Sequence, residues 1–176
     1  MKWVSEKEVK SLRTAARASR CSVRNELIIL MLYRHGLRVS ELCNLRVNQL
    51  DLELSKLHVA RLKNGISFSH PISGDELRLI RRYLKIRKNK DFPYLFVSER
   101  GNQLSRFTVT KMIEACCKEL DLRKITPHML RHGCGYYLAN KGYDTRVIQD
   151  YLGHKNIQNT VIYTRLSGKQ FEGMWQ

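Results

Sequence analysis

Hydrophobic residues recur three or four positions apart along most of this chain, which is the spacing of one face of an α-helix. The pattern predicts helices from Ser5 to about Arg20, from Arg24 to Tyr33, from Ser73 to about Lys88 and from Arg106 to about Leu120. The first helix begins with a serine followed three positions later by a glutamate, a pair whose side chains cap each other's backbone N–H groups. The unbroken apolar run that ends the second helix predicts that this helix lies at the centre of the fold.

Two further helices are predicted near the C-terminus from their start and stop signals. Thr126 supplies a hydroxyl cap, and Pro127 has the fixed φ that suits the first helical position. Asp144 can cap the next helix, and Gly153 can end it. These signals bracket two short helices joined by a turn.

Alternating apolar and polar residues predict two β-strands, over residues 56–62 and 66–72. Between them Asn64-Gly65 favours a tight hairpin turn. Pro71 has no N–H to donate, so the second strand is expected to end at, or lie along, a sheet edge. Residues 94–97 predict a short third strand. The expected fold class is therefore mainly α with a small three-stranded antiparallel sheet (α+β).

The charge balance narrows the class of partner. The chain has 176 residues, enough for a single domain over 1–176 with a real core, and no linker or repeat marks a second domain. It carries 32 Lys and Arg against 16 Asp and Glu, a formal net charge of +16. Such an excess favours a polyanion, most often nucleic acid. A ribosome-associated protein, or charge that serves solubility alone, would account for the same balance.

The cysteines and the N-terminus indicate the compartment. Five cysteines lie in the chain, two of them adjacent and none in a C-x-x-C pair that would suit zinc. They are expected to be reduced thiols, mostly in the core. The N-terminus has no apolar stretch of the kind found in signal peptides. We expect a cytoplasmic protein.

The C-terminal part combines residue types that suit phosphate chemistry. His128 and Arg131 lie three positions apart and share one helical face, His154 follows a helix stop, and Tyr163 ends an apolar run. Arginine binds phosphate through two parallel N–H groups, histidine exchanges a proton near neutral pH, and tyrosine can be a nucleophile. Taken singly, each residue would usually be structural or exposed, so the argument rests on their occurring together.

These residues and their neighbours resemble the C-terminal signature of the tyrosine recombinases, the phage integrase family. The resemblance covers roughly Ser5 to Trp175 and is strongest to the short fimbrial phase-variation recombinases. It rests on several motifs in one order: Gly36-Leu37-Arg38-Val39-Ser40-Glu41-Leu42, Arg61-Leu62-Lys63-Asn64-Gly65, His70-Pro71, Leu104-Ser105-Arg106, Pro127-His128-Met129-Leu130-Arg131-His132, Leu152-Gly153-His154 and Tyr163.

The resemblance implies a complete catalytic set. Tyr163 would attack a DNA phosphodiester and form a 3′-phosphotyrosyl bond, and Lys63 would protonate the departing 5′-oxygen. The remaining members would stabilise charge or assist proton transfer: Arg38 and Arg131 at the non-bridging oxygens, His128 beside the nucleophile, and His154 on the phosphate.

Other residues are expected to support this set. The resemblance implies that Glu41 orients the site, and His132 is expected to support packing. Arg106, Thr108 and Lys111 open a predicted helix and are candidates for the DNA surface, because a helix N-terminus favours phosphate oxygens. His35, His58 and His70 are expected to be structural or surface residues.

The resemblance also implies an architecture and partners. Most tyrosine recombinases have an N-terminal helical domain that closes a clamp around DNA. Only some 30 residues precede the Arg38 motif here, so the expected fold is the catalytic domain without that core-binding domain. Residues 164–176 would either pack on their own core or dock on a neighbouring subunit. The expected assembly is a homotetramer on two synapsed sites and a monomer when free, with accessory DNA-bending proteins as a further hypothesis.

The expected function is a site-specific recombinase that needs neither metal nor ATP and has no cofactor. It would invert a promoter-bearing segment between short inverted repeats and so control fimbrial phase variation on bacterial nucleoid DNA. The sequence has no Asp and Glu cluster with two-metal spacing, which argues against a metal nuclease. Three alternatives stay open: a non-catalytic DNA-binding regulator, an integrase, and an enzyme like type IB topoisomerases.

Overall fold

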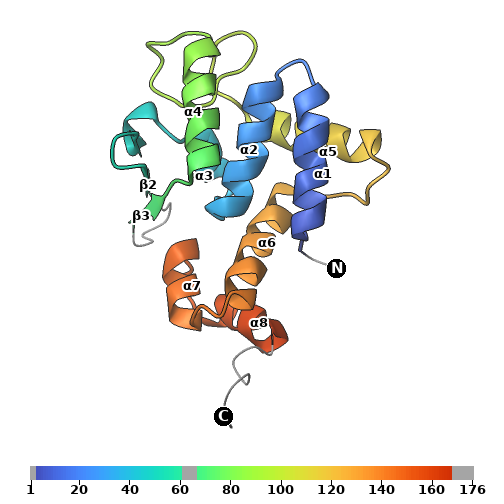
Figure 1. The fold of residues 1–176 in the computed structure, drawn as a ribbon, viewed down its shortest axis with the longest axis vertical. Coiled ribbons are helices and arrows are strands. Elements are labelled where there is room, and N and C mark those ends of the chain that lie inside the picture. The colour runs from blue at the N-terminus through green and yellow to red at the C-terminus, as the bar shows by residue number, and fades with distance from the viewer. Residues whose placement is uncertain (1–2, 61–66, 168–176) are drawn as a thin grey trace.

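The computed structural model describes residues 3–60 and 67–167, and Figure 1 shows their arrangement. The main bundle consists of α1 (Glu6–Ala18), α2 (Ser22–Arg34), α4 (Gly74–Ile86) and α5 (Arg106–Glu119). From this bundle α6 (Pro127–Asn140) runs out and carries α7 (Thr145–Leu152) and α8 (Gln158–Ser167) at its far end. The short α3 (Val39–Cys43) and the 3-10 turn η1 (Val47–Gln49) connect α2 to the sheet.

The second helix is the centre of the bundle, as its sequence predicts. It contacts α1, α3, α4, α5 and α6, and every residue from Leu27 to Tyr33 is buried. Near its start the carboxylate of Glu26 is also buried, and it accepts hydrogen bonds from Arg13 (2.8 Å) and Arg17 (2.6 Å) of α1. The one acidic side chain on this apolar helix is therefore paired, which a buried charge requires.

Local signals set the helix ends. The Ser5 hydroxyl accepts from the Glu8 N–H (3.3 Å), and the Glu8 carboxylate accepts from the Ser5 N–H (2.9 Å), which confirms the predicted reciprocal cap. Thr126 and Asp144 cap α6 and α7 with their side-chain oxygens. Gly153 ends α7 with a φ of 65°, in the left-handed region that favours glycine.

The sheet is three-stranded and antiparallel, in the order β1-β2-β3. Its strands are β1 (Leu50–Asp51), β2 (Lys56–Val59) and β3 (Phe68–Pro71). Leu57 and Val59 point into the core and their neighbours are exposed, which is the predicted alternation. Pro71 lies on an edge strand, as expected. The hairpin tip with Lys63 lies outside the described residues.

The third strand is β1, so the strand predicted over residues 94–97 is wrong. Leu95 and Phe96 are fully buried, which accounts for the apolar signal in the sequence. The segment forms only isolated bridges, one from Tyr94 to Arg46 and one from Val97 to Gln103. Each of these pairings extends over a single bridge, too short to make the segment a strand.

A smaller core lies where α6, α7 and α8 meet. It contains the buried residues Cys134, Ala139, Ile148, Leu152 and Tyr163. All five cysteines are free, and four of them are buried. Within the described ranges, none of the helices is both long and apolar enough to cross a membrane.

Candidate active site

A cavity of about 340 Å³ opens where the turn after α2 meets α6 and α8. It brings together five of the six residues predicted to be catalytic, and Lys63 is the sixth, outside the described residues. The lining consists of Arg38, His128, Arg131, His132, His154, Gln158, Asn159, Ile162 and Tyr163. Side chains that are far apart in the sequence thus meet around one space.

The cavity wall is built around the buried guanidinium of Arg131, whose exposed fraction is 3%. Arg131 donates hydrogen bonds to two backbone carbonyls, those of Gly36 and Leu152, the latter at 2.7 Å. Gly36 has a φ of +54°, and a Cβ there would lie 2.3 Å from Cδ2 of Leu152. Only glycine therefore fits where the chain turns and presents its carbonyl to Arg131.

One buried carboxylate links the two predicted catalytic arginines. Glu41 Oε1 lies 2.8 Å from Nη1 of Arg38, and Glu41 Oε2 lies 3.8 Å from Nη1 of Arg131. Glu41 Oε2 also accepts from the backbone N–H of Arg38 (2.8 Å), which fixes the start of α3. The side chain of Arg38 is 41% exposed, whereas that of Glu41 is 2% exposed. Two fixed positive charges share one negative charge, so these three groups leave a net positive charge beside the cavity.

Tyr163 lies in the middle of α8 and is 1% exposed. Its hydroxyl is 2.8 Å from Nδ1 of His132, and its ring packs edge-on against Tyr136. Burial raises the pKa of Tyr163 to about 12, although the positive charge of Arg131 acts in the opposite direction. Gly135 makes room for this ring, because a Cβ there would come within 2.6 Å of it. The neutral side chain of Tyr163 is thus buried in the smaller core.

Two histidines continue the contact from Tyr163 toward the surface. Nε2 of His132 lies 2.8 Å from Nε2 of His128. A neutral phenol that donates to Nδ1 of His132 leaves the ring proton on Nε2, from where it can be donated to His128. Burial lowers the pKa of His128, and the charges of Arg131 and Arg38 lower it further, so this ring is neutral and able to accept a proton.

His154 is oriented by a neighbour on α8. Its Nδ1 lies 2.9 Å from the Thr160 hydroxyl, and its ring lies nearly parallel to that of Tyr163, with the centroids 6.3 Å apart. His154 lines the cavity, and its Nε2 is the candidate for a hydrogen bond to an anion there.

Sequence reasoning assigned His132 to packing, whereas the structure places it in direct contact with the Tyr163 hydroxyl. His128, expected beside the nucleophile, is one ring further away. The sequence does indicate the contact between His128 and His132, because residues four positions apart lie on one helical face. Gln158 and Asn159, which also line the cavity, were not singled out.

The candidate DNA-surface residues lie away from the cavity. Arg106, Thr108 and Lys111 are exposed on the first turns of α5, and Lys111 forms an ion pair with Glu114 (3.0 Å). Gln103, just before this helix, donates to the carbonyl of Cys43 at the end of α3. The start of α5 is thus tied to the short helix that follows Arg38.

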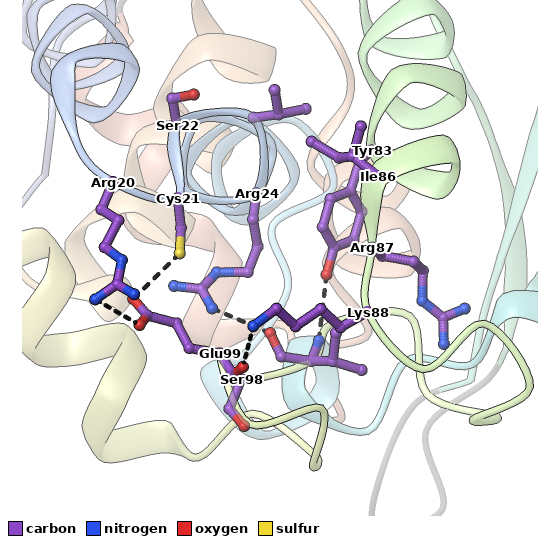
Figure 2. A pocket seen from close by; sticks show the side chains of 12 residues that line it. Arg20, Cys21, Ser22, Arg24, Tyr83, Ile86, Arg87, Lys88, Ser98 and Glu99 are labelled. Atoms are coloured by element: carbon purple, nitrogen blue, oxygen red, sulfur yellow. Dashed lines mark hydrogen bonds and ion pairs between the residues drawn. The ribbon is translucent and has the colours of Figure 1, made fainter.

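A second cavity, of about 330 Å³, contains none of the predicted site residues. It lies between the α1–α2 turn and the end of α4, and Figure 2 shows its lining side chains. Glu99 pairs with Arg20 (3.2 Å), and its carbonyl accepts from Lys88 (2.8 Å). In the described part of the chain, no three His, Cys, Asp or Glu side chains are grouped to hold a metal ion.

Comparisons with known proteins agree with this geometry. The profile of the Phage integrase family matches residues 2–170. The Type 1 fimbriae regulatory protein FimE of Escherichia coli K12 is 40% identical over 180 residues, which cover 99% of this chain and 91% of that protein. The crystal structure of XerA recombinase superposes with a TM-score of 0.84 at 32% identity, over 97% of this chain and 65% of that one. XerH recombinase bound to its difH substrate has a TM-score of 0.79 at 22% identity, over 100% of this chain and 53% of that one, and shows likeness of fold.

Proposed function

Since the chain belongs to the phage integrase family, the tyrosine recombinases, we propose that it cuts and rejoins double-stranded DNA through a covalent bond to Tyr163. The observation that supports this most directly is the single cavity that holds Tyr163 together with Arg38, Arg131 and three histidines. Tyrosine hydroxyls also bind phosphate in non-catalytic proteins, so the contact of the Tyr163 hydroxyl with His132, a candidate general base, is what favours catalysis.

The proposed reaction exchanges one phosphate ester for another. The Tyr163 oxygen attacks phosphorus, the bond from phosphorus to the 5′-oxygen breaks, and the 5′-oxygen leaves as a hydroxyl. The product is a 3′-phosphotyrosyl bond, which a 5′-hydroxyl from a partner strand then attacks in the reverse sense. Each step breaks one phosphate ester bond and forms another, so their number is unchanged and no ATP is needed. The phenolate is a far better leaving group than an alkoxide.

Charge and protons are handled by separate groups in this proposal. Arg38 and Arg131 stabilise the extra negative charge on the non-bridging oxygens, a role that preorganised charge performs well in a low-dielectric site. His132 accepts the proton of Tyr163 and passes its own Nε2 proton to His128, along the two 2.8 Å contacts. His154 binds a non-bridging oxygen. Lys63 would supply the proton to the 5′-oxygen, a role that is inferred from the family motif.

The buried position of Tyr163 describes a resting state. The Tyr163 side chain lines the cavity but is only 1% exposed, and its pKa of about 12 keeps the hydroxyl protonated at neutral pH. We propose that α8 shifts when DNA fills the cavity, so that phosphate and arginine charges approach the hydroxyl together. The excess of 32 basic over 16 acidic residues supplies the long-range attraction for this substrate.

The biological role is proposed from the relatives. The likeness to a fimbriae regulatory protein over 99% of this chain supports inversion of a promoter-bearing segment between inverted repeats. We propose that residues 1–176 act as one catalytic domain on the bacterial nucleoid, in the cytoplasm. Four protomers would join two sites, and DNA-bending proteins would assist. Of the segment 164–176 expected to dock on a neighbour, residues 164–167 end α8, and residues 168–176 lie outside the described residues. Arg106, Thr108 and Lys111 would contact DNA beside the site.

The test uses a duplex nicked near the cleavage position, so that the cut strand diffuses away and the adduct is trapped. The wild-type protein should give a covalent protein–DNA band on a denaturing gel without added metal, and Tyr163→Phe should give none. Tyr136→Phe is the matched control, because this tyrosine packs against Tyr163 in the same core yet should still form the adduct.

Other outcomes would favour the alternatives. An adduct from Tyr163→Phe would refute the assignment of the nucleophile. Tight binding without any adduct, on DNA that carries the chromosomal inverted repeats, would favour a non-catalytic regulator. Relaxation of supercoiled plasmids that lack those repeats would favour the chemistry of type IB topoisomerases.

A further inference from the structure

Behind the active-site wall lies a buried cluster of polar side chains that the proposed reaction does not use. His35 and Glu76 are each 1% exposed, and Nε2 of His35 lies 2.7 Å from Oε1 of Glu76. Nδ1 of His35 lies 3.3 Å from Nδ1 of His70, which is also 1% exposed. The His70 ring stacks on Tyr151 with a centroid distance of 3.8 Å and an interplanar angle of 20°. We call these four residues the His35–Tyr151 cluster.

The cluster joins four separate elements. His35 caps the end of α2, His70 is on β3, Glu76 is on α4 and Tyr151 is on α7. The Tyr151 hydroxyl closes a ring of contacts, because it donates to the carbonyl of Arg34, the residue before His35 (2.9 Å). The Arg34 guanidinium in turn contacts Glu76 (3.4 Å) and both carboxylate oxygens of Asp75 (2.8 and 2.9 Å).

Two members of the cluster directly precede the carbonyls that hold Arg131. His35 is followed by Gly36, and Tyr151 is followed by Leu152. These are the two residues whose carbonyls accept hydrogen bonds from the Arg131 guanidinium. The φ and ψ of one residue separate each of these carbonyls from the residue before it. Gly36 is held at a φ of +54° against Leu152, and Leu152 lies in α7, so a displacement of His35 or Tyr151 is passed on to these carbonyls.

We propose that the His35–Tyr151 cluster is a positioning unit for Arg131, and this rests on the proposed role of Arg131 in binding the reacting phosphate. The cluster joins the end of α2 to the end of α7, and so fixes the spacing of the two carbonyls. Buried ionic groups bring little net stability, since desolvation offsets their attraction, and an apolar core of equal volume would stabilise as well. A role in placing backbone oxygens accounts for polar groups at this depth.

The cluster also bears on the strand beside the hairpin. His70 is on β3, the strand that follows the segment with Lys63. Its stacking on Tyr151 joins the edge of the sheet to α7, and residues of these two elements are in contact. A change at His70 should therefore also displace the carbonyls of Gly36 and Leu152, because His70 contacts both His35 and Tyr151.

The test separates positioning from simple stability by using paired variants. Tyr151→Phe keeps the ring and removes the hydroxyl that holds the Arg34 carbonyl. His70→Phe keeps an aromatic ring on Tyr151 and removes the nitrogen that faces His35. His70→Asn restores a polar atom at the position of Nδ1. The control is Tyr83→Phe, which removes another buried hydroxyl, one that accepts from the Val97 N–H (3.2 Å) away from the active site.

Three quantities are measured for each variant: the affinity for DNA, the melting temperature, and the single-turnover rate of adduct formation on the pre-bound nicked duplex. Misplacement of a catalytic group by about 1 Å can cost about 100-fold, so we expect Tyr151→Phe and His70→Phe to slow adduct formation at least about tenfold. Affinity should change less than about twofold, because Arg131 is one of many positive charges that bind DNA, whereas its placement matters most for the charge that develops in the transition state. His70→Asn should recover most of the rate, and Tyr83→Phe should keep the wild-type rate at a similar loss of melting temperature.

A second measurement does not depend on catalysis. The side-chain Nε–H signal of Arg131 in a ¹⁵N NMR spectrum, assigned with Arg131→Lys, should be sharp in the wild type and in Tyr83→Phe. It should broaden or shift in Tyr151→Phe and His70→Phe. An unchanged signal with an unchanged rate would overturn the inference, as would equal rate losses in Tyr83→Phe. If the wild type forms no adduct, the proposed function fails, and the NMR signal alone decides whether the cluster positions Arg131.

Discussion

Replacing Gly36 with alanine tests the packing around the Gly36 and Leu152 carbonyls, which accept hydrogen bonds from Arg131. The new methyl group meets two obstacles: a φ of +54°, and Cδ2 of Leu152 at 2.3 Å from the Cβ position. Left-handed backbone costs a non-glycine residue about 1–2 kcal/mol. Overpacking of a buried site costs about 1–3 kcal/mol. Together, Gly36→Ala should lower the free energy of unfolding by about 2–5 kcal/mol.

Gly142→Ala is the matched control for backbone strain. Gly142 has a φ of +84°, and nothing lies within 4 Å of its Cβ position. This variant should therefore cost only the strain, about 1–2 kcal/mol. The difference between the two variants isolates the contact with Leu152. A chain of this length loses about 2–4 °C of melting temperature per kcal/mol, so Gly36→Ala should lose about 4–20 °C and Gly142→Ala about 2–8 °C.

Thermal unfolding followed by circular dichroism gives these values, and the double variant Gly36→Ala with Leu152→Ala completes a cycle. Removing the Leu152 side chain removes the obstacle, so the double variant should be less destabilised than the sum of the single variants by about 1–3 kcal/mol. Adduct formation should be lost in Gly36→Ala and kept in Gly142→Ala. Equal melting temperatures for the two glycine variants, or strict additivity in the cycle, would refute the packing argument.

The remaining predictions concern protons. His132→Ala should slow adduct formation by about 10²–10⁴-fold, and more than His128→Ala does, in a time course on a denaturing gel. The hydrogen bond from Arg123 lowers the pKa of Glu8 to about 2, so this pair stabilises the fold above about pH 4.5, and its contribution is lost as the pH falls toward 2. In Arg123→Ala, the free energy of unfolding should therefore depend less on pH over this range. Burial raises the pKa of Tyr163 to about 12, so the stability that the neutral phenol contributes is complete below about pH 10 and is lost as the pH rises through 12. In Tyr163→Phe, the free energy of unfolding should depend less on pH over this range.

Local signals in the sequence predicted the helices, because caps depend on neighbours within one turn. Ser5 with Glu8, Thr126 and Asp144 behave as their residue types require. The segment 94–97 was mistaken for a strand, since apolar character reports burial and does not report whether another strand lies alongside. Pairing partners far away in the sequence decide that question.

The candidate site shows the same division. The resemblance of the motifs around Arg38 and Arg131 to the tyrosine recombinases predicted that these residues share one site, and both line the same cavity. The contact between His132 and Tyr163 depends on how α6 and α8 cross, which sequence spacing does not specify. The depth of Tyr163 and the backbone acceptors of Arg131 also arise only from tertiary packing.

The storage of Tyr163 inside the smaller core has a consequence for fidelity. Under the proposed mechanism, exposing this ring costs free energy that contacts with DNA must supply. A bacterial chromosome offers a very large number of incorrect sites, and a strongly basic protein occupies many of them. Those sites supply fewer contacts, so the protein can be bound there with its nucleophile still inside. If Tyr163 is the nucleophile, cleavage should therefore be more selective than binding, because a protein bound at an incorrect site keeps this ring buried.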